Sequence, residues 1–470
     1  MTGMKIDVLI AGIGSAGFAA AYRLFALCPG VRAVLVDPNP GPGGTSVFGG
    51  VCCWEPGRSG YGVHFELARR LMDAGEGFVG KTTEFVSRDN RWAISSRCGD
   101  PYESTLRRFR VSPEDMRRFH FSPEGMSRTM GEMLGEAARG SECVPLFRSS
   151  LEAVTADGGR IVSVKIRTPD GVIDAEPGLV IDCIGGAAVA ALAGETMAMG
   201  EEARGTYGEP SAPDTASLCM NGITQCFRIT PCPAGEEPFR MPEEYADVDL
   251  GDWEEQMRRT DGPVACWNED PRGGYIVNML PTAPGGLLAD TDFRDLERLC
   301  GARVYGWWRW LRDRCPSVRG YRIESLFPRL GLRENCRLVG QYVLREQDLL
   351  NGIPFCGADS VVAIADHPAD IHGSGGRLTP TGVYGIPYPC LLPRHTDNLL
   401  VSGMSASFSH LAASSARLSR TMLELGEAAG VAAAVCVRQG ILPGDVPVGL
   451  IRKEVRADEM LREILQNRPG

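Results

Sequence analysis

The sequence predicts an α/β protein whose parallel-sheet domain is formed from both ends of the chain. Residues 5–10 and 31–36 are apolar stretches of strand length, separated by a glycine turn and an alanine-rich stretch of helix length. Residues 179–184 and 398–401 are continuous apolar runs, which are typical of strands buried in a parallel sheet. Between about residues 205 and 330 the chain is instead rich in proline, tryptophan and charged residues.

These observations divide the 470-residue chain into two domains. We expect one α/β domain over residues 1–200 and 385–470, with an α+β cap domain inserted over residues 201–384. A strand pattern covers residues 143–154, and residues 414–437 predict a single long helix. Gly426 and Gly430 indicate that this helix packs closely against a neighbour.

Composition and charge exclude several classes of function. A net charge of −10 argues against a protein that binds nucleic acid or coats an anionic membrane. No run reaches the roughly 18 apolar residues of a membrane-spanning helix, and the first strand begins almost at the start, so we expect a cytoplasmic protein. The 16 cysteines are scattered, without zinc-finger spacing, and predict no metal site.

The most specific motif is the string GIGSAG at residues 12–17. It follows the first strand and begins the helix, as in the Rossmann-type dinucleotide-binding unit. There Gly12 permits the tight turn, Gly14 lets the backbone approach a pyrophosphate, and Gly17 lets helix and strand pack closely. Asp37 ends the next strand, twenty residues past Gly17, where its carboxylate can hold the adenosine ribose. A carboxylate there disfavours NADP.

Three later segments indicate which dinucleotide is bound. The strings GGTS at residues 43–46, VIDCIGG at 180–186 and DNLLVSG at 397–403 occur in the order found in flavoproteins. Together with the first motif, they resemble the glutathione-reductase-like superfamily, and this resemblance implies FAD.

One branch of that superfamily fits in more detail. The strings PRLGLRE at residues 328–334, RLVGQYVL at 337–344, AD at 365–366, ADIH at 369–372 and GIPY at 385–388, with residues 405–434, resemble the bacterial FAD-dependent oxidoreductase family. The family implies redox chemistry on many substrates, with covalent or non-covalent FAD. The chain departs from it at residues 409–414, which read SHLAAS where a string like HEAHG is usual. Residues 200–320 resemble nothing that we can place.

The resemblance and the glycine turns together predict the cofactor-binding residues. They lie in turns or at strand ends, and they are Gly12, Gly14, Ser15, Ala16, Gly17, Asp37, Pro38, Gly43, Gly44, Thr45, Ser46, Gly49, Gly50, Leu151, Cys183, Ile184, Gly185, Gly403, Met404 and Arg417.

Four residues are candidates for catalysis. His372 and His410 lie in segments that resemble the family, and an imidazole can exchange protons near neutral pH. Arg333 can bind a carboxylate substrate or the electron-rich edge of the flavin, because guanidinium is a fixed fork of donors. Tyr342 is a further candidate base. The alternatives are structural: histidines that cap loops, and an ion-pair cluster of arginines with Glu334.

Two other patterns have structural explanations that we favour. Cys52 and Cys53 are out of register with the redox pair of disulfide reductases, so packing explains them better than a dithiol mechanism; a thiol near the flavin or a covalent flavin link stays open. Trp308 and Trp310 resemble part of a flavin-halogenase motif, but Leu311 follows them where that motif has isoleucine. We expect these tryptophans in the core.

The sequence therefore predicts an FAD-dependent dehydrogenase or oxidase that transfers hydride from a small-molecule substrate to the flavin. No second GxGxxG motif is present for a nicotinamide cofactor, and the electron acceptor stays open among O₂, a quinone or another compound. One alternative is a flavin monooxygenase or halogenase, and another is a flavoprotein subunit that acts on a partner protein. A homodimer is one possible assembly.

Overall fold

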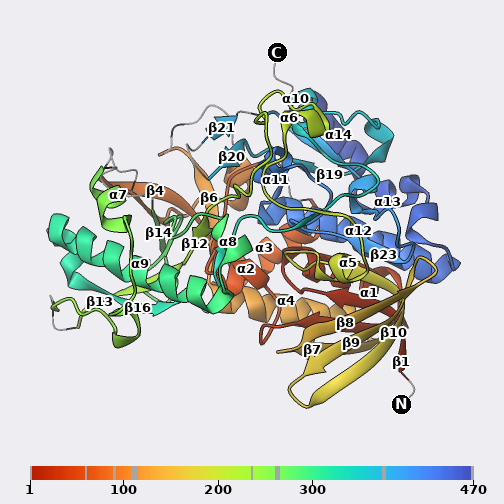
Figure 1. The fold of residues 1–470 in the computed structure, drawn as a ribbon, viewed down its shortest axis with the longest axis horizontal. Coiled ribbons are helices and arrows are strands. Elements are labelled where there is room, and N and C mark those ends of the chain that lie inside the picture. The colour runs from red at the N-terminus through yellow and green to blue at the C-terminus, as the bar shows by residue number, and fades with distance from the viewer. Residues whose placement is uncertain are drawn as a thin grey trace.

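The fold has two main sheets with helices between and around them (Figure 1). The computed structural model describes residues 3–58, 61–87, 92–106, 112, 114–233, 235, 237–259, 265–372, 377–379 and 381–466. No helix in these ranges is long and apolar enough to cross a membrane.

The first sheet confirms the predicted Rossmann-type unit. Its strand order is β7-β2-β1-β10-β9-β8, and β23 also pairs with β10. Strands β7, β2, β1, β10 and β23 run parallel to one another, whereas β9 and β8 form an antiparallel arm. Their bounds are β1 Met4–Ala11, β2 Arg32–Asp37, β7 Glu142–Phe147, β8 Ser150–Asp157, β9 Arg160–Thr168, β10 Gly171–Asp182 and β23 Leu399–Val401.

Two helices from opposite ends of the chain pack against each other beside this sheet. Helix α1 (Ser15–Leu27) follows β1, and helix α12 (Ser419–Gln439) lies beside it in Figure 1. A Cβ at Gly426 would lie 2.1 Å from the carbonyl oxygen of Ala16, and one at Gly430 would lie 2.3 Å from that of Ala20. The close packing predicted at these two glycines is confirmed, and it fixes the start of α12 near the start of α1.

The second sheet has eight strands in the order β16-β13-β15-β14-β5-β4-β6-β3. Their bounds are β3 Cys53–Trp54, β4 Gly77–Ser87, β5 Trp92–Arg97, β6 Arg117–Phe121, β13 Phe227–Pro231, β14 Cys266–Glu269, β15 Tyr275–Asn278 and β16 Tyr321–Leu326. Half of these strands come from residues 53–121, which lie inside the segment expected to form only the first domain. The expected cap domain over residues 201–384 therefore supplies only half of the strands of this sheet, and residues 53–121 supply the other half.

The remaining helices cover the two sheets or connect them. They are α2 Gly44–Val47, α3 Val63–Asp73, α4 Pro123–Ala137, α5 Ala188–Leu192, α6 Arg204–Tyr207, α7 Trp253–Arg259, α8 Leu287–Asp290, α9 Phe293–Arg314, α10 Glu346–Asn351, α11 His410–Ala416, α13 Val448–Glu454 and α14 Ala457–Gln466. Trp308 and Trp310, on α9, are 3% and 7% exposed in the core against the second sheet, which confirms their expected packing role.

The described residues also form four two-stranded sheets. They pair β11 (Met197–Ala198) with β18 (Arg337–Leu338), β12 (Ile223–Thr224) with β17 (Gly331–Leu332), β19 (Val361–Ala365) with β22 (Tyr384–Pro387), and β20 (Ala369–Ile371) with β21 (Arg377–Thr379).

Candidate active site

A cavity of about 720 Å³ has walls contributed by both main sheets. One part of its wall consists of the turn before α1 and the ends of β2 and β10, where parallel α/β sheets bind ligands. Another part consists of side chains from the second sheet. The third part consists of β20 and the junction between α11 and α12. The volume lies within the usual range for pockets that hold cofactors and substrates.

The turn between β1 and α1 is held by the carboxylate of Asp37. One oxygen of this carboxylate accepts a hydrogen bond of 2.6 Å from the backbone N–H of Ile13, and the other accepts bonds from the backbone and side chain of Asn39. Burial raises the pKa of Asp37, against the opposing effect of these hydrogen bonds. Asp37 also lines the cavity, so the residue that shapes the turn lies on the cavity wall.

Most of the predicted cofactor-binding residues line this cavity. They are Gly12, Gly14, Ser15, Ala16, Asp37, Pro38, Gly44, Thr45, Leu151, Cys183, Ile184, Gly185, Gly403, Met404 and Arg417. The loop that contains Cys183 and Ile184 is held by Asp182, whose carboxylate accepts hydrogen bonds from the backbone of Ile184, Val189 and Ala190.

Five predicted cofactor-binding residues lie behind the wall rather than on it: Gly17, Gly43, Ser46, Gly49 and Gly50. A Cβ at any of the four glycines would come within 1.8 to 2.9 Å of a neighbouring atom, so their absent side chains permit close packing. The hydroxyl of Ser46 lies 3.4 Å from that of Ser419, which links α2 to the start of α12. In the structure these residues pack together the segments that form the wall.

His372 and Asp370 form a pair on the cavity wall. The Nε2 atom of His372 lies 2.6 Å from a carboxylate oxygen of Asp370, and its backbone N–H donates to the side chain of Asn221. Burial lowers the pKa of His372, against the opposing effect of Asp370, and this shift favours the neutral imidazole. Because Nε2 faces Asp370, Nδ1 is the ring atom that can accept a proton.

Arg333 and Arg417 lie on the same part of the wall. One nitrogen of Arg333 donates to the carbonyl of Gly222 and to the hydroxyl of Thr224, at 2.9 and 2.6 Å. Arg417 donates to the backbone carbonyl of Asp370, and its other terminal nitrogen lies 3.8 Å from the Asp370 carboxylate. Burial and the nearby charge of Arg333 lower the pKa of Arg417 to about 10.

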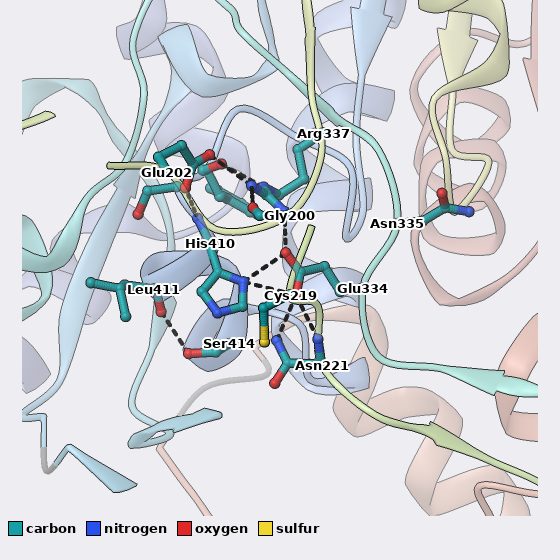
Figure 2. Close-up of polar contacts among 12 residues, drawn as sticks. Gly200, Glu202, Cys219, Asn221, Glu334, Asn335, Arg337, His410, Leu411 and Ser414 are labelled. Carbon is teal, nitrogen blue, oxygen red and sulfur yellow. Dashed lines mark hydrogen bonds and ion pairs between the residues drawn. The ribbon is translucent and has the colours of Figure 1, made fainter. Parts of the chain in front are cut away.

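His410 belongs to a buried ion network that does not reach the cavity (Figure 2). Its Nδ1 atom lies 2.9 Å from both carboxylate oxygens of Glu334, which also pairs with Arg337. Arg337 in turn contacts Glu202 at 2.7 Å. Burial raises the pKa of Glu334, but the bond and charge of His410 and the charge of Arg337 outweigh it and lower this pKa. The position of His410 does not fit the proton-transfer role expected from sequence.

The segment between β17 and β18 presents alternate residues to two environments. Figure 2 shows Glu334 turned toward His410, whereas Asn335 points away from the network. Arg333 and Asn335 line the cavity. The network is connected to the wall through Asn221, which donates twice to Glu334 and accepts the backbone N–H of His372.

Tyr342 also lies away from the cavity wall. Its hydroxyl donates to Asp348 at 2.7 Å and accepts from the backbone of Phe355, so it stabilises the loop around α10. Burial and the bond to Asp348 raise its pKa. The catalytic role expected for Tyr342 does not fit this position.

The family model of FAD-dependent oxidoreductases matches residues 7–456, nearly the whole chain. The chain belongs to the FAD-dependent oxidoreductase family. This membership confirms FAD as the cofactor, as the resemblance in the sequence implied. Among curated proteins, none matches the sequence.

Solved structures resemble this FAD-dependent oxidoreductase at low identity. A geranylgeranyl bacteriochlorophyll reductase-like protein from Thermoplasma acidophilum has a TM-score of 0.44 and 12% identity, covering 99% of this chain and 86% of its own. A myxobacterial chondrochloren halogenase has a TM-score of 0.43 and 12% identity. The match covers 98% of this chain and 81% of the halogenase. A p-nitrophenol 4-monooxygenase from Pseudomonas putida has a TM-score of 0.40 and 12% identity. The match covers 98% of this chain and 86% of the monooxygenase. These likenesses are too distant to indicate a reaction.

The wall near α1 fits the diphosphate of FAD. Gly12 has a φ of +84°, and a Cβ there would lie 2.8 Å from the backbone of Cys183. A Cβ at Gly44 would lie 2.8 Å from the Cα of Gly14. Without these side chains, the backbone N–H groups in the first turn of α1 remain open to an anion and lie at the positive end of the helix dipole.

Replacing Asp37 with alanine should weaken FAD binding by about 1–3 kcal/mol, because charge-assisted hydrogen bonds are lost. Titration of apoprotein with FAD, followed by quenching of flavin fluorescence, measures the change. Asp7→Ala is the matched control, since Asp7 lies on β1 and pairs with Arg32 away from the cavity. Equal FAD affinity in Asp37→Ala and the parent would show that Asp37 does not hold the cofactor.

The second sheet supplies wall residues that the sequence did not single out. They include Glu55, Thr82, Ser95, Arg118, Asn268 and Asn278. Arg118, on β6, pairs at 3.0 Å with Glu55, which directly follows β3, but neither segment contains a local motif. Asp370, Asn335 and Arg420 were also missed, although each lies within three residues of a predicted site residue. That spacing is the signal that could have found them.

The cysteine pair divides between core and cavity. Cys52 is 1% exposed in the core, whereas Cys53 lines the cavity. Burial raises the pKa of the Cys53 thiol to about 12 and that of Cys52 well above its usual value. Neither is a ready thiolate, and this result agrees with the packing explanation favoured from sequence.

Buried carboxylates anchor the chain that follows Glu55. The backbone N–H groups of Tyr61 and Val63 donate to Glu424 and Glu427, both on α12. Burial raises the pKa of Glu427 to about 7, against the opposing charge of Arg23.

This pKa predicts a stability that depends on pH. The folded-state value exceeds the ordinary one, so the stabilisation is complete below about pH 4.5 and is lost as the pH rises through 7. Glu427→Gln should remove that loss, so its advantage over the parent should grow by about 2–3 kcal/mol between pH 5 and pH 8. Urea unfolding at both pH values measures the difference. Parallel pH dependence in the two proteins would contradict the prediction.

Proposed function

We propose that this FAD-dependent oxidoreductase dehydrogenates a small-molecule substrate that carries a hydroxyl or amino group. The observation that carries the proposal is the Asp370–His372 pair on the wall of the cavity that fits FAD, with 2.6 Å between Nε2 and the carboxylate. FAD supplies the hydride acceptor in this reaction. The chain supplies a proton acceptor beside it.

His372 accepts the proton of the substrate. Its neutral imidazole is suited to this step because burial lowers its pKa. Asp370 holds Nε2, fixes the ring orientation and stabilises the positive charge that forms when Nδ1 takes a proton. As the proton leaves the hydroxyl or amino group, hydride leaves the adjacent carbon, and a C=O or C=N bond forms.

Anaerobic mixing tests the proposal. The yellow holoenzyme is mixed with a panel of small alcohols, hydroxy acids and amines without nicotinamide, and flavin absorbance is followed. The expected result is bleaching by an organic compound alone, with one equivalent of oxidised product.

Two other outcomes would identify the alternative functions. Bleaching by NADH or NADPH only, followed by insertion of oxygen into the substrate, would indicate a monooxygenase or halogenase. A flavin that no small molecule bleaches, in a protein that copurifies with a stable partner, would indicate a subunit that acts on another protein. Either outcome would overturn the proposed dehydrogenation.

A further inference from the structure

The part of the cavity around Asp370 has an excess of positive charge. Arg333 and Arg417 line this part of the cavity, and Arg420 also lines the cavity. The hydrogen bonds of Arg333 and Arg420 go to neutral carbonyl and hydroxyl oxygens. Among the described residues, the carboxylate within ion-pair distance of these arginines is that of Asp370, 3.8 Å from Arg417, and it is also bonded to His372.

Nearby acidic residues balance this charge only in part: the charges of Asp370 and Glu334 raise the pKa of Arg417, but burial and Arg333 outweigh them. Glu334 follows Arg333 in the chain, but its carboxylate faces away from the cavity and is committed to Arg337 and His410. The Arg417 side chain is only 9% exposed. A buried cation is costly to the fold unless a counter-charge or full hydrogen bonding compensates it. An anion bound in the cavity would therefore stabilise the arginines beside Asp370.

We propose that Arg333 and Arg417 form an anion subsite that binds the carboxylate of the substrate. This inference deepens the proposed function, because the subsite lies beside the proton acceptor His372. Two guanidinium groups suit a carboxylate, since each offers a planar fork of N–H donors. The diphosphate of FAD fits a different part of the wall, at the start of α1.

Ligand binding to the oxidised holoenzyme tests the subsite without any turnover. Benzoate and acetate are titrated against the flavin absorbance spectrum, with benzamide and acetamide as neutral counterparts of the same shape. The carboxylates should bind at least about tenfold more tightly than the amides, the factor expected for about 1.4 kcal/mol. Arg333→Met and Arg417→Met should each remove that preference.

Two sets of variants make the result specific. Arg329→Met removes the same charge from the same cavity, at the end where Arg329 bonds to Asn39, and should keep the preference for carboxylates. Arg333→Lys and Arg417→Lys keep the positive charge and should restore part of the preference for carboxylates. They also test the subsite if the methionine variants fail to fold.

Another anion could occupy the subsite, namely the electron-rich ring of reduced flavin. The flavin midpoint potential of each variant is therefore measured as well. If the methionine variants lower the potential but leave carboxylate affinity unchanged, the ring is the anion and the proposal is wrong. Equal binding of carboxylates and amides to the parent also overturns it. Because no turnover is needed, either failure is distinguishable from failure of the proposed dehydrogenation.

Discussion

His372→Ala should slow flavin reduction by the substrate by about 10²–10⁴-fold, the usual contribution of a general base. The reason is that the substrate would lose its proton acceptor while the cavity stays otherwise intact. Because burial lowers the pKa of His372 below the ordinary value for histidine, reduction by the parent should stay independent of pH down through about 6.5 and slow only at lower pH. Anaerobic stopped-flow measurements across this range determine both effects.

Two other histidine variants are the controls for this prediction. His395 is exposed and does not line the cavity, so His395→Ala should reduce at the parental rate. His410→Ala should lower stability, with reduction in the folded fraction near that of the parent. If FAD-loaded His372→Ala reduces within about threefold of the parent, His372 does not act as a general base of the usual strength.

Glu334→Ala should destabilise the fold by about 3–5 kcal/mol, because it removes one of the two carboxylates that pair with the buried Arg337 cation and leaves only Glu202. Both side chains are only 1% exposed, and Glu334 also holds His410 and Asn221. Denaturant unfolding of the holoenzyme measures the loss, and Glu334→Gln separates the charge from the shape.

The exposed pair Arg69–Asp73 provides a contrast to this prediction. Its side chains are 67% and 66% exposed, so Asp73→Ala should change stability by less than about 0.5 kcal/mol. Similar losses in Glu334→Ala and Asp73→Ala would mean that the buried network does not stabilise the fold.

The parts of the fold that depend on local backbone geometry could be predicted from the sequence. The GIGSAG string forms the turn after β1 and the first three residues of α1, and Asp37 ends β2 beside it. Such motifs are readable because a tight turn and a close helix approach require glycine at fixed positions. The resemblance to the family added Arg333 and His372, both on the cavity wall.

Two expected elements are interrupted in the structure. The single helix expected over residues 414–437 is two helices, because Leu418 is extended, with φ −67° and ψ 146°. That break leaves Arg417 on the cavity wall instead of inside a helix. The strand expected over residues 143–154 divides into β7 and β8 where Arg148 has a φ of +55°. Hydrophobic pattern alone does not report such backbone turns, since the side chains on either side remain apolar.

The second sheet could not be predicted because its strands come from distant segments. Strand β14 pairs with β5, so residues near 267 lie beside residues near 94. No local pattern indicates such a pairing, and the wall residues Arg118 and Asn278 become neighbours of the cavity only through it. For the same reason, the sequence could not separate His372 from His410: both lie in segments that resemble the family, and only the fold places one on the wall.

A crystal structure of the yellow holoenzyme tests most directly the claim that this one cavity holds both FAD and the catalytic groups. We expect the diphosphate at the turn before α1, the adenosine ribose at Asp37, and the isoalloxazine ring between α12 and the second sheet, facing His372. A ring directed away from His372 and Arg417, or FAD bound outside this cavity, would contradict the account.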